Sequence, residues 1–253
     1  MSSAETVPGM ATLIADPWWS RFTHIDDVDV IHVDLSPNAA RESQALWFLN
    51  EWERERWTRY YPGAPRRRFA LSRAALRTVL CETLSCDNDE LEFGWVERGK
   101  PRAYVDGIPA PLHFNVSHSG DNGMLAISRD HQVGIDIEEI SQVFRFDAII
   151  ESTFSPDEQA TVSAAEKDHA ARAFFEIWTL KEAIIKATGV GLSANLQCIA
   201  TPPAMCGGAV TGQVRLPEFP DVCWRLHKFS GNDFVGALAV ESVPSPVVED
   251  AFE

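Results

Sequence analysis

Residues 176–191 read EIWTLKEAIIKATGVG, a stretch in which charged side chains stand among aromatic and branched ones. The spacing predicts a helix on which Trp178, Glu182 and Lys186 share one face, because they follow one another at intervals of four residues. Charged groups on an otherwise apolar helix are unfavourable unless they bind a partner. This helix is therefore the first candidate for carrying chemistry.

The order of predicted elements around this helix occurs twice in the chain. Each half contains an apolar strand (30–33 and 133–137), a helix start at a Ser-Pro pair (36–37 and 155–156), a helix with arginine and phenylalanine near its start (68–72 and 172–175) and a glycine-containing hairpin (118–127 and 229–240). Agreement in the same order predicts an internal repeat. We therefore expect an α+β pseudo-dimer of two similar subdomains, residues 1–129 and 130–253. Each is a small, mainly antiparallel sheet packed with a long helix, and a ligand site is expected between them.

Composition excludes several classes of protein. The 253 residues carry a net charge of -15, which argues against nucleic-acid binding because a phosphate backbone attracts clustered positive charge. No uncharged apolar run reaches the roughly 18 residues that cross a bilayer. The sequence also has no apolar segment near its start of the kind found in export signals. We expect a cytoplasmic protein that does not bind membranes.

Positive charge is concentrated in one part of this acidic chain. Its arginines there are Arg54, Arg56, Arg59, Arg66, Arg67, Arg68, Arg73 and Arg77. An ordinary ion pair on a solvated helix face explains any one of them. As a cluster, they predict a site for a small polyanion.

Residues 134–138, Gly-Ile-Asp-Ile-Glu, alternate between apolar and acidic side chains. In a strand, this alternation directs both isoleucines to one face and Asp136 and Glu138 to the other. Two carboxylates side by side suit magnesium, which takes one or two carboxylates together with water and substrate phosphates. Taken alone, the pair also fits an ordinary exposed strand, so it gains weight only from the helix.

The helix has a simpler interpretation as well. An amphipathic helix commonly carries an i,i+4 pair such as Glu182 and Lys186, which contributes only a few tenths of a kcal/mol. Here, however, the charged residues have apolar neighbours on several sides. Gly189 or Gly191 is expected to end the helix as its C-cap. The helix therefore favours a third carboxylate and an ammonium group at the same site.

Residues 114–120, Phe-Asn-Val-Ser-His-Ser-Gly, run from an apolar strand into a polar turn. Hydroxyl groups, a histidine and the free backbone N–H groups of a glycine turn can hold a phosphate. Ser117 and His118 are adjacent on a strand and point to opposite faces, so they do not form a catalytic triad. On its own, His118 is also explained as an ordinary surface histidine.

Three of these blocks, 115–120, 134–138 and 178–186, resemble the signature blocks of the 4'-phosphopantetheinyl transferases in order and spacing. Length and repeated architecture resemble the surfactin-synthetase-activator (Sfp-type) class, a pseudo-dimer within one chain, and Gly99-Lys100-Pro101 is similar to that class too. The resemblance implies transfer of 4'-phosphopantetheine from coenzyme A to a serine of an apo acyl or peptidyl carrier protein, in fatty acid or secondary metabolite biosynthesis. A monomer is expected, because the pseudo-dimer lies within one chain.

The resemblance implies a metal site and a reaction. Asp136, Glu138 and Glu182 match the ligands of a magnesium ion on the coenzyme A pyrophosphate, with manganese as an alternative ion. The carrier serine attacks the β-phosphorus and 3',5'-ADP leaves, while Lys186 neutralises charge and Glu182 is the nearest candidate for taking the serine proton. Catalytic roles are thus implied for Glu182, Lys186 and Asp136.

Coenzyme A contacts are implied for a further set of positions. These are Arg56, Arg68, Lys100, Ser117, His118, Lys181 and Lys186. Within the set, Arg56 and Arg68 match contacts of the 3'-phosphate, and Lys100 matches a residue beside the nucleotide. Two alternatives stay open: a magnesium-dependent phosphohydrolase that uses the same acids, and an inactive module that binds coenzyme A or carrier proteins.

Overall fold

The structure is a computed structural model that describes residues 16–95, 100–141, 146–167, 169–191 and 195–242. Gly99, which is part of the Gly-Lys-Pro motif, lies outside these residues. The chain ends 1–12 and 244–253 lie outside them too. Within the described part, no helix combines the length and the apolar character needed to span a membrane.

Two four-stranded antiparallel sheets form the framework. The first has the order β1 (Trp19–Ile25), β2 (Val28–Asp34), β7 (Asn122–Ser128) and β6 (His113–Ser119). The second has the order β8 (Val133–Glu139), β11 (Phe234–Glu241), β10 (Phe219–Ser230) and β9 (Thr211–Leu216). The sequence did not predict a third, small sheet, which is made of β3 (Leu91–Trp95), β4 (Pro101–Val105) and β5 (Ile108–Pro109).

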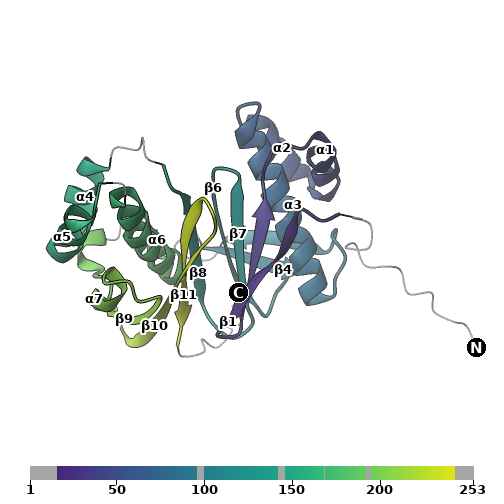
Figure 1. Cartoon of the computed structure of the whole chain (residues 1–253). Helices are drawn as coiled ribbons and strands as arrows, with labels where there is room; N and C mark the ends of the chain where they lie inside the picture. The colour runs from purple at the N-terminus through teal and green to yellow at the C-terminus, as the bar shows by residue number, and fades with distance from the viewer. Residues whose placement is uncertain (1–15, 96–99, 142–145, 168, 192–194, 243–253) are drawn as a thin grey trace, which may run out of the picture.

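Helices cover the outer sides of the two large sheets (Figure 1). The first half contains α1 (Ala39–Phe48), α2 (Glu51–Arg59) and α3 (Ala64–Leu84). The second contains α4 (Asp147–Thr153), α5 (Pro156–Ala164), α6 (Ala170–Thr188), a short 3-10 turn η4 (Leu196–Cys198) and α7 (Pro203–Cys206). Figure 1 shows the two groups of helices on opposite sides, with the strands between them.

Strand pairing is equivalent in the two halves. β2 pairs with β7 and β7 with β6, just as β8 pairs with β11 and β11 with β10. The long helices α3 and α6 occupy corresponding places in the chain order. The expected α+β fold with antiparallel sheets in two halves is thus confirmed, while the boundary between residues 129 and 130 stays a prediction.

The predicted helix starts are correct in one half and wrong in the other. Ser155 caps α5 as expected, and it forms a capping box with Glu158. In the first half, Asn38 is the cap of α1 instead of Ser36, because its side chain accepts hydrogen bonds from two amides of the first turn. The proline at 37 therefore lies before the helix.

α6 packs directly on the backbone of the second sheet. Its apolar residues, including Phe174 and Ile184, are buried, and the helix ends at Gly189, whose φ of 70° is left-handed. Gly134 of β8 allows the close approach, since a Cβ atom there would overlap the carbonyl oxygen of Ala183. The distance between the charged face of α6 and strand β8 is consequently fixed by this contact.

The two sheets share one apolar core. Val30 and Met124 of the first sheet pack in the same buried cluster as Ile135, Ile137 and Leu238 of the second. Burial of apolar surface between the halves is the main force that keeps them together. The charged residues between them therefore sit on a packed base.

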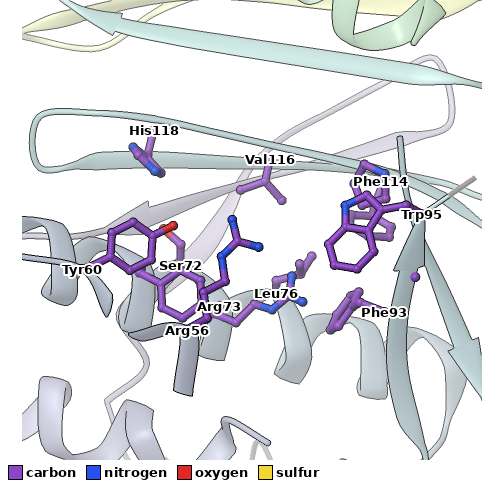
Figure 2. Close-up of a pocket in the computed structure, with 13 residues that line it drawn as sticks. Arg56, Tyr60, Ser72, Arg73, Leu76, Phe93, Trp95, Phe114, Val116 and His118 are labelled. Atoms are coloured by element: carbon purple, nitrogen blue, oxygen red, sulfur yellow. The ribbon is translucent and has the colours of Figure 1, made fainter. Parts of the chain in front are cut away.

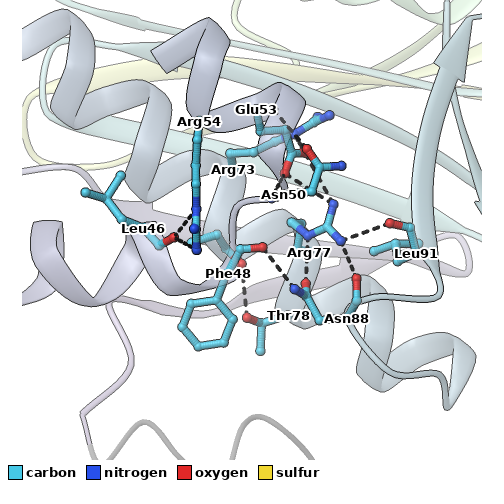
Figure 3. Close-up of polar contacts among 11 residues, drawn as sticks. Leu46, Phe48, Asn50, Glu53, Arg54, Arg73, Arg77, Thr78, Asn88 and Leu91 are labelled. Carbon is cyan, nitrogen blue, oxygen red and sulfur yellow. Dashed lines mark hydrogen bonds and ion pairs between the residues drawn. The ribbon is translucent and has the colours of Figure 1, made fainter. Parts of the chain in front are cut away.

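A buried glutamate clamps α2 to α3 (Figure 3). Glu53 is 0% exposed, completes a capping box with Asn50, and binds Arg73 and Arg77 of α3 through its carboxylate. Arg77, 1% exposed, also donates to the carbonyl oxygen of Leu91 at 2.9 Å. Two members of the arginine cluster thus hold the first half together instead of binding an anion.

A second buried ion pair lies in the other half. Lys181 is 0% exposed, and its Nζ lies 2.8 Å from Glu158 Oε2 while donating to the carbonyl oxygens of Leu196 and Ile199 at 2.8 and 2.6 Å. The other carboxylate oxygen accepts from the Thr201 amide and hydroxyl. The ammonium of Lys181 is therefore enclosed and its donors are occupied by the protein, and its expected contact with coenzyme A stays a prediction.

Replacing Lys181 tests this structural role. Lys181→Met leaves the Glu158 charge buried without its partner, so we expect the free energy of unfolding to fall by about 3–5 kcal/mol in chemical denaturation. The matched control is Lys167→Met at an exposed lysine, which should change it by less than about 0.5 kcal/mol. Equal stability of Lys181→Met and the wild-type protein would contradict the assignment.

Candidate active site

The candidate site lies where the two sheets meet edge to edge. β6 is the last strand of the first sheet and β8 the first strand of the second, and side chains join them. Asn115 Oδ1 accepts a hydrogen bond from the Ile135 amide at 2.9 Å, and Ser119 Oγ accepts one from the Glu139 amide at 3.1 Å. We call this junction of β6 and β8 the seam.

At the centre of the seam, three elements bring one polar side chain each to a single point. Ser117 of β6 donates its hydroxyl hydrogen to Asp136 Oδ1 of β8 at 2.8 Å. Lys186 Nζ of α6 donates to the same oxygen at 2.6 Å and to Ser117 Oγ at 2.9 Å. Side chains from both halves of the chain therefore meet at this point.

The two remaining predicted metal ligands lie beside this group. Ser119 Oγ donates to Glu138 Oε2 at 2.6 Å, whereas Glu182 makes no hydrogen bond or ion pair with the described residues. Burial raises the pKa of Asp136, Glu138 and Glu182, and the negative charge of Asp136 raises the pKa of both glutamates further. The three carboxylates are therefore close enough to repel one another.

An excess of buried negative charge suits a cation. Asp136 is 4% exposed, and its Oδ2 is buried without a hydrogen-bond partner in the described residues. An unpaired carboxylate oxygen next to further carboxylates is the hard donor type that magnesium prefers. No three acidic, histidine or cysteine side chains of the described segments are yet arranged to ligate a metal ion. The carboxylate oxygens of Asp136 are suitable ligands for such an ion. That Glu138 and Glu182 bind the same ion stays a prediction.

A cavity of about 270 Å³ opens on the other side of β6 (Figure 2). Strand alternation points Phe114, Val116 and His118 into it, opposite to the seam. Aromatic residues of α3 and β3, including Phe69 and Phe93, form apolar walls. Its polar lining includes Arg56, Ser72 and Arg73, and Figure 2 shows the arginines facing β6 from the helices below. Such a cavity suits a flat ring with a negatively charged group attached to it.

Most of the arginine cluster is occupied within the protein. Three of its members donate to backbone carbonyl groups: Arg54 to Leu46, Arg66 to Thr58 and Tyr60, and Arg67 to Leu35. Four form ion pairs: Arg59 with Glu55, Arg67 with Asp121, and both Arg73 and Arg77 with Glu53. Arg56 stacks over the rings of Trp52 and Phe69 without an acceptor in the described residues. Arg68 approaches Asp121 only to 3.8 Å, and its buried Nε has no partner there. Arg56 and Arg68 are the arginines best placed to bind an added anion.

His118 lies on the cavity side of β6, next in sequence to Ser117 of the seam. Burial lowers the pKa of its imidazole, and the positive charges of Arg68 and Lys186 lower it further. Both positive charges thus act on His118, and we call the stretch from Arg68 past His118 to Lys186 the cationic strip. The strip favours a ligand with several negative groups along its length.

Lys100 is separated from this strip. Its Nζ donates to Gln132 Oε1 at 2.6 Å and to the carbonyl oxygens of Val133 and Ala187 at 3.2 and 3.0 Å. An ammonium group has three N–H donors, so none is left for a nucleotide. Lys100 is therefore held by protein groups, and its expected contact with coenzyme A stays a prediction.

The structure adds residues that the sequence interpretation did not single out. Asn115 and Ser119 hold the seam, and their spacing of two around Ser117 is the signal that could have placed all three on one face. Ser72 lines the cavity with a buried hydroxyl that has no hydrogen-bond partner in the segments the structure describes, and no motif marks it.

Comparisons with known proteins agree with this geometry. The profile described as the 4'-phosphopantetheinyl transferase superfamily matches residues 132–239, and the profile described as the N-terminal region of 4'-phosphopantetheinyl transferases matches residues 34–130. A 4'-phosphopantetheinyl transferase of Bacillus subtilis is 31% identical over 166 residues, covering 66% of this chain and 71% of the relative.

Two further relatives carry the same name. The putative 4'-phosphopantetheinyl transferase of Synechocystis is 33% identical over 153 residues, covering 60% of this chain and 61% of the relative. The transferase Sfp of Bacillus subtilis strain 168 is 27% identical over 194 residues, covering 77% and 83%. With the two profiles matching consecutive halves and the seam formed between them, the chain belongs to the 4'-phosphopantetheinyl transferase family.

Proposed function

We propose that this protein transfers the 4'-phosphopantetheine group of coenzyme A to a serine of an apo acyl or peptidyl carrier protein, giving the holo carrier protein and 3',5'-ADP. The observation that carries the proposal is the meeting of Ser117, Asp136 and Lys186 at the end of a cationic strip, in a chain of this family. A cytoplasmic location and a monomeric state belong to the same proposal.

The placement of coenzyme A follows from charge and shape. Its adenine ring suits the aromatic cavity, and its 3'-phosphate suits Arg56 and Arg68, which have no acceptor within hydrogen-bonding distance in the described part of the chain. The pyrophosphate then extends past His118 toward Ser117 and Lys186 at the seam. In this arrangement the reacting phosphorus lies beside the buried carboxylates.

The chemistry is a displacement at phosphorus. The oxygen of the carrier serine forms a bond to the β-phosphorus, the bond from that phosphorus to the bridging oxygen breaks, and 3',5'-ADP takes the electron pair. Lys186 stabilises the negative charge that develops on the pyrophosphate. Glu182, which has no partner in the described residues and a pKa raised by burial, accepts the serine proton.

Magnesium, or manganese in its place, would be held by Asp136 with Glu138 and Glu182. When bound, the ion supplies further neutralisation of pyrophosphate charge. The protein's own contribution is to bury these carboxylates and to hold Lys186 at the seam through a hydrogen bond to Ser117.

The direct test incubates the protein with coenzyme A, magnesium and an apo carrier protein and measures the carrier by intact mass spectrometry. A gain of one phosphopantetheine on the serine supports the proposal. Phosphate release from coenzyme A without that gain would favour the phosphohydrolase, and coenzyme binding without any turnover would favour the inactive module. None of the named relatives points to either alternative.

Lys186 is expected to act on the chemical step. Lys186→Met should lower kcat by about 10²-fold or more and change KM for coenzyme A by less than about threefold, because the charge it neutralises develops during reaction. The matched control is Lys228→Met, which removes another lysine ion pair, with Glu176, in the same half. An unchanged kcat in Lys186→Met, measured in a steady-state transfer assay, would contradict its role.

Arg68 is expected to act on binding of the 3'-phosphate. Arg68→Ala should raise KM for coenzyme A about tenfold with little change in kcat, and dephospho-coenzyme A, which lacks that phosphate, should erase the difference from wild type. Arg59→Ala removes an exposed arginine paired with Glu55 and should leave KM unchanged. If Arg68→Ala weakens both substrates equally, Arg68 does not bind the 3'-phosphate.

A further inference from the structure

Lys100 joins three parts of the molecule at one point. It precedes β4 in the first half, and its side chain crosses to Gln132 and Val133 at the start of β8 and to Ala187 in the last turn of α6. The three acceptor distances, 2.6, 3.2 and 3.0 Å, account for all three N–H groups of the ammonium. This set of contacts is called the Lys100 clasp below.

The acceptor on α6 is a group that the helix cannot satisfy. The last four carbonyl groups of a helix have no amide partner within it, and Ala187 is the next-to-last residue of α6. The negative end of the helix dipole lies there, so a cation is favoured. Lys100 therefore acts as a C-terminal cap supplied by the other half of the chain.

The cation itself is held without a close carboxylate. No ion pair joins Lys100 to an acidic residue of the described segments, and burial lowers its pKa to about 8, with Glu241 acting in the opposite sense. Glu241 is linked to Lys100 through Gln132, whose backbone N–H donates to the Glu241 carboxylate at 3.2 Å and whose side-chain oxygen accepts from Lys100. The Lys100 ammonium is thus stabilised mainly by carbonyl dipoles, and the positions of these carbonyl groups depend on the placement of β8 and α6.

On both β8 and α6, the residues of the Lys100 clasp are close in sequence to the residues of the seam. Val133 is three residues before Asp136 on β8, and Ala187 directly follows Lys186 on α6. At the same level, the close packing of Gly134 on α6 leaves little room for the two elements to slide. A single cation therefore fixes the spacing between the strand that carries Asp136 and the helix that carries Lys186.

We propose that Lys100 is a positioning residue for phosphopantetheine transfer, which holds the start of β8 and the end of α6 so that Asp136 and Lys186 meet at the seam. This inference rests on the proposed function. It differs from a nucleotide contact, because the side chain acts on protein carbonyl groups and not on the coenzyme.

The kinetic test separates these two roles. Lys100→Met keeps the length of the side chain and removes its donors, so kcat should fall at least about tenfold while KM for coenzyme A changes less than about threefold. Lys100→Arg keeps a charge and several donors and should restore kcat to within about threefold of wild type. Lys167→Met, an exposed lysine, should match wild type. A raised KM with unchanged kcat in Lys100→Met would overturn the proposal in favour of nucleotide binding.

A second readout does not depend on activity. Amide hydrogen exchange in the peptide that covers residues 185–191 should speed up at least about tenfold in Lys100→Met and stay unchanged in Lys167→Met, because the end of α6 loses its cap. Unchanged exchange in Lys100→Met would overturn the clasp. If the wild-type protein transfers no phosphopantetheine, the proposed function fails, and hydrogen exchange still decides whether the clasp exists.

Gln132→Ala is a second test of the proposal, for the case that Lys100→Met does not fold. This variant removes one of the three acceptors and leaves Lys100 in place. A smaller fall in kcat, again with little change in KM, supports the proposal. Wild-type kcat and wild-type exchange at 185–191 in a folded Gln132→Ala protein would count against it.

Discussion

The protein depends on one short contact between its halves, the oxygen of Asp136 that accepts hydrogen bonds from both Ser117 and Lys186. Neither sheet contains all three groups, so the site exists only when the edge strands β6 and β8 lie against each other. The shared apolar core beneath supplies the driving force for that arrangement, while the polar seam fixes its register. Folding and assembly of the site are consequently one event.

Charge is divided between structure and chemistry in a consistent way. Ion pairs that are fully enclosed, such as Glu53 with Arg77 and Lys181 with Glu158, join helices and leave no donor for a ligand. Beside the cavity and the seam, Arg68 Nε and Asp136 Oδ2 have no hydrogen-bond partner among the described residues. A buried polar atom without a partner is unfavourable, so such atoms are candidates for contact with a charged ligand.

Sequence periodicity was sufficient for much of the fold. The helix at 170–188, its end at one of the two candidate glycines, 189 or 191, and the helix start at Ser155 depend on local geometry, and all three were predicted correctly. Asn38 was missed because two candidate caps lie close together, and only hydrogen bonds to the first turn choose between them.

The partners of long side chains could not be read from the sequence. Lys100 and Lys181 bind carbonyl groups far along the chain, at Ala187 and at Leu196 and Ile199, and tertiary packing alone creates those acceptors. Asp136 and Ser117 were predictable because strand alternation fixes which way a short side chain points. Motif resemblance thus pointed to residues that meet at the seam, and it carried no information on the carbonyl groups that Lys100 and Lys181 bind.

The most direct test is a crystal structure of the protein with coenzyme A and magnesium. The account predicts the adenine ring in the cavity beside Arg56, the 3'-phosphate at Arg68, and the pyrophosphate at the seam within hydrogen-bonding distance of Lys186, with the metal ion on Asp136. Coenzyme A bound away from the seam, or a pyrophosphate that contacts residues of only one half, would contradict it.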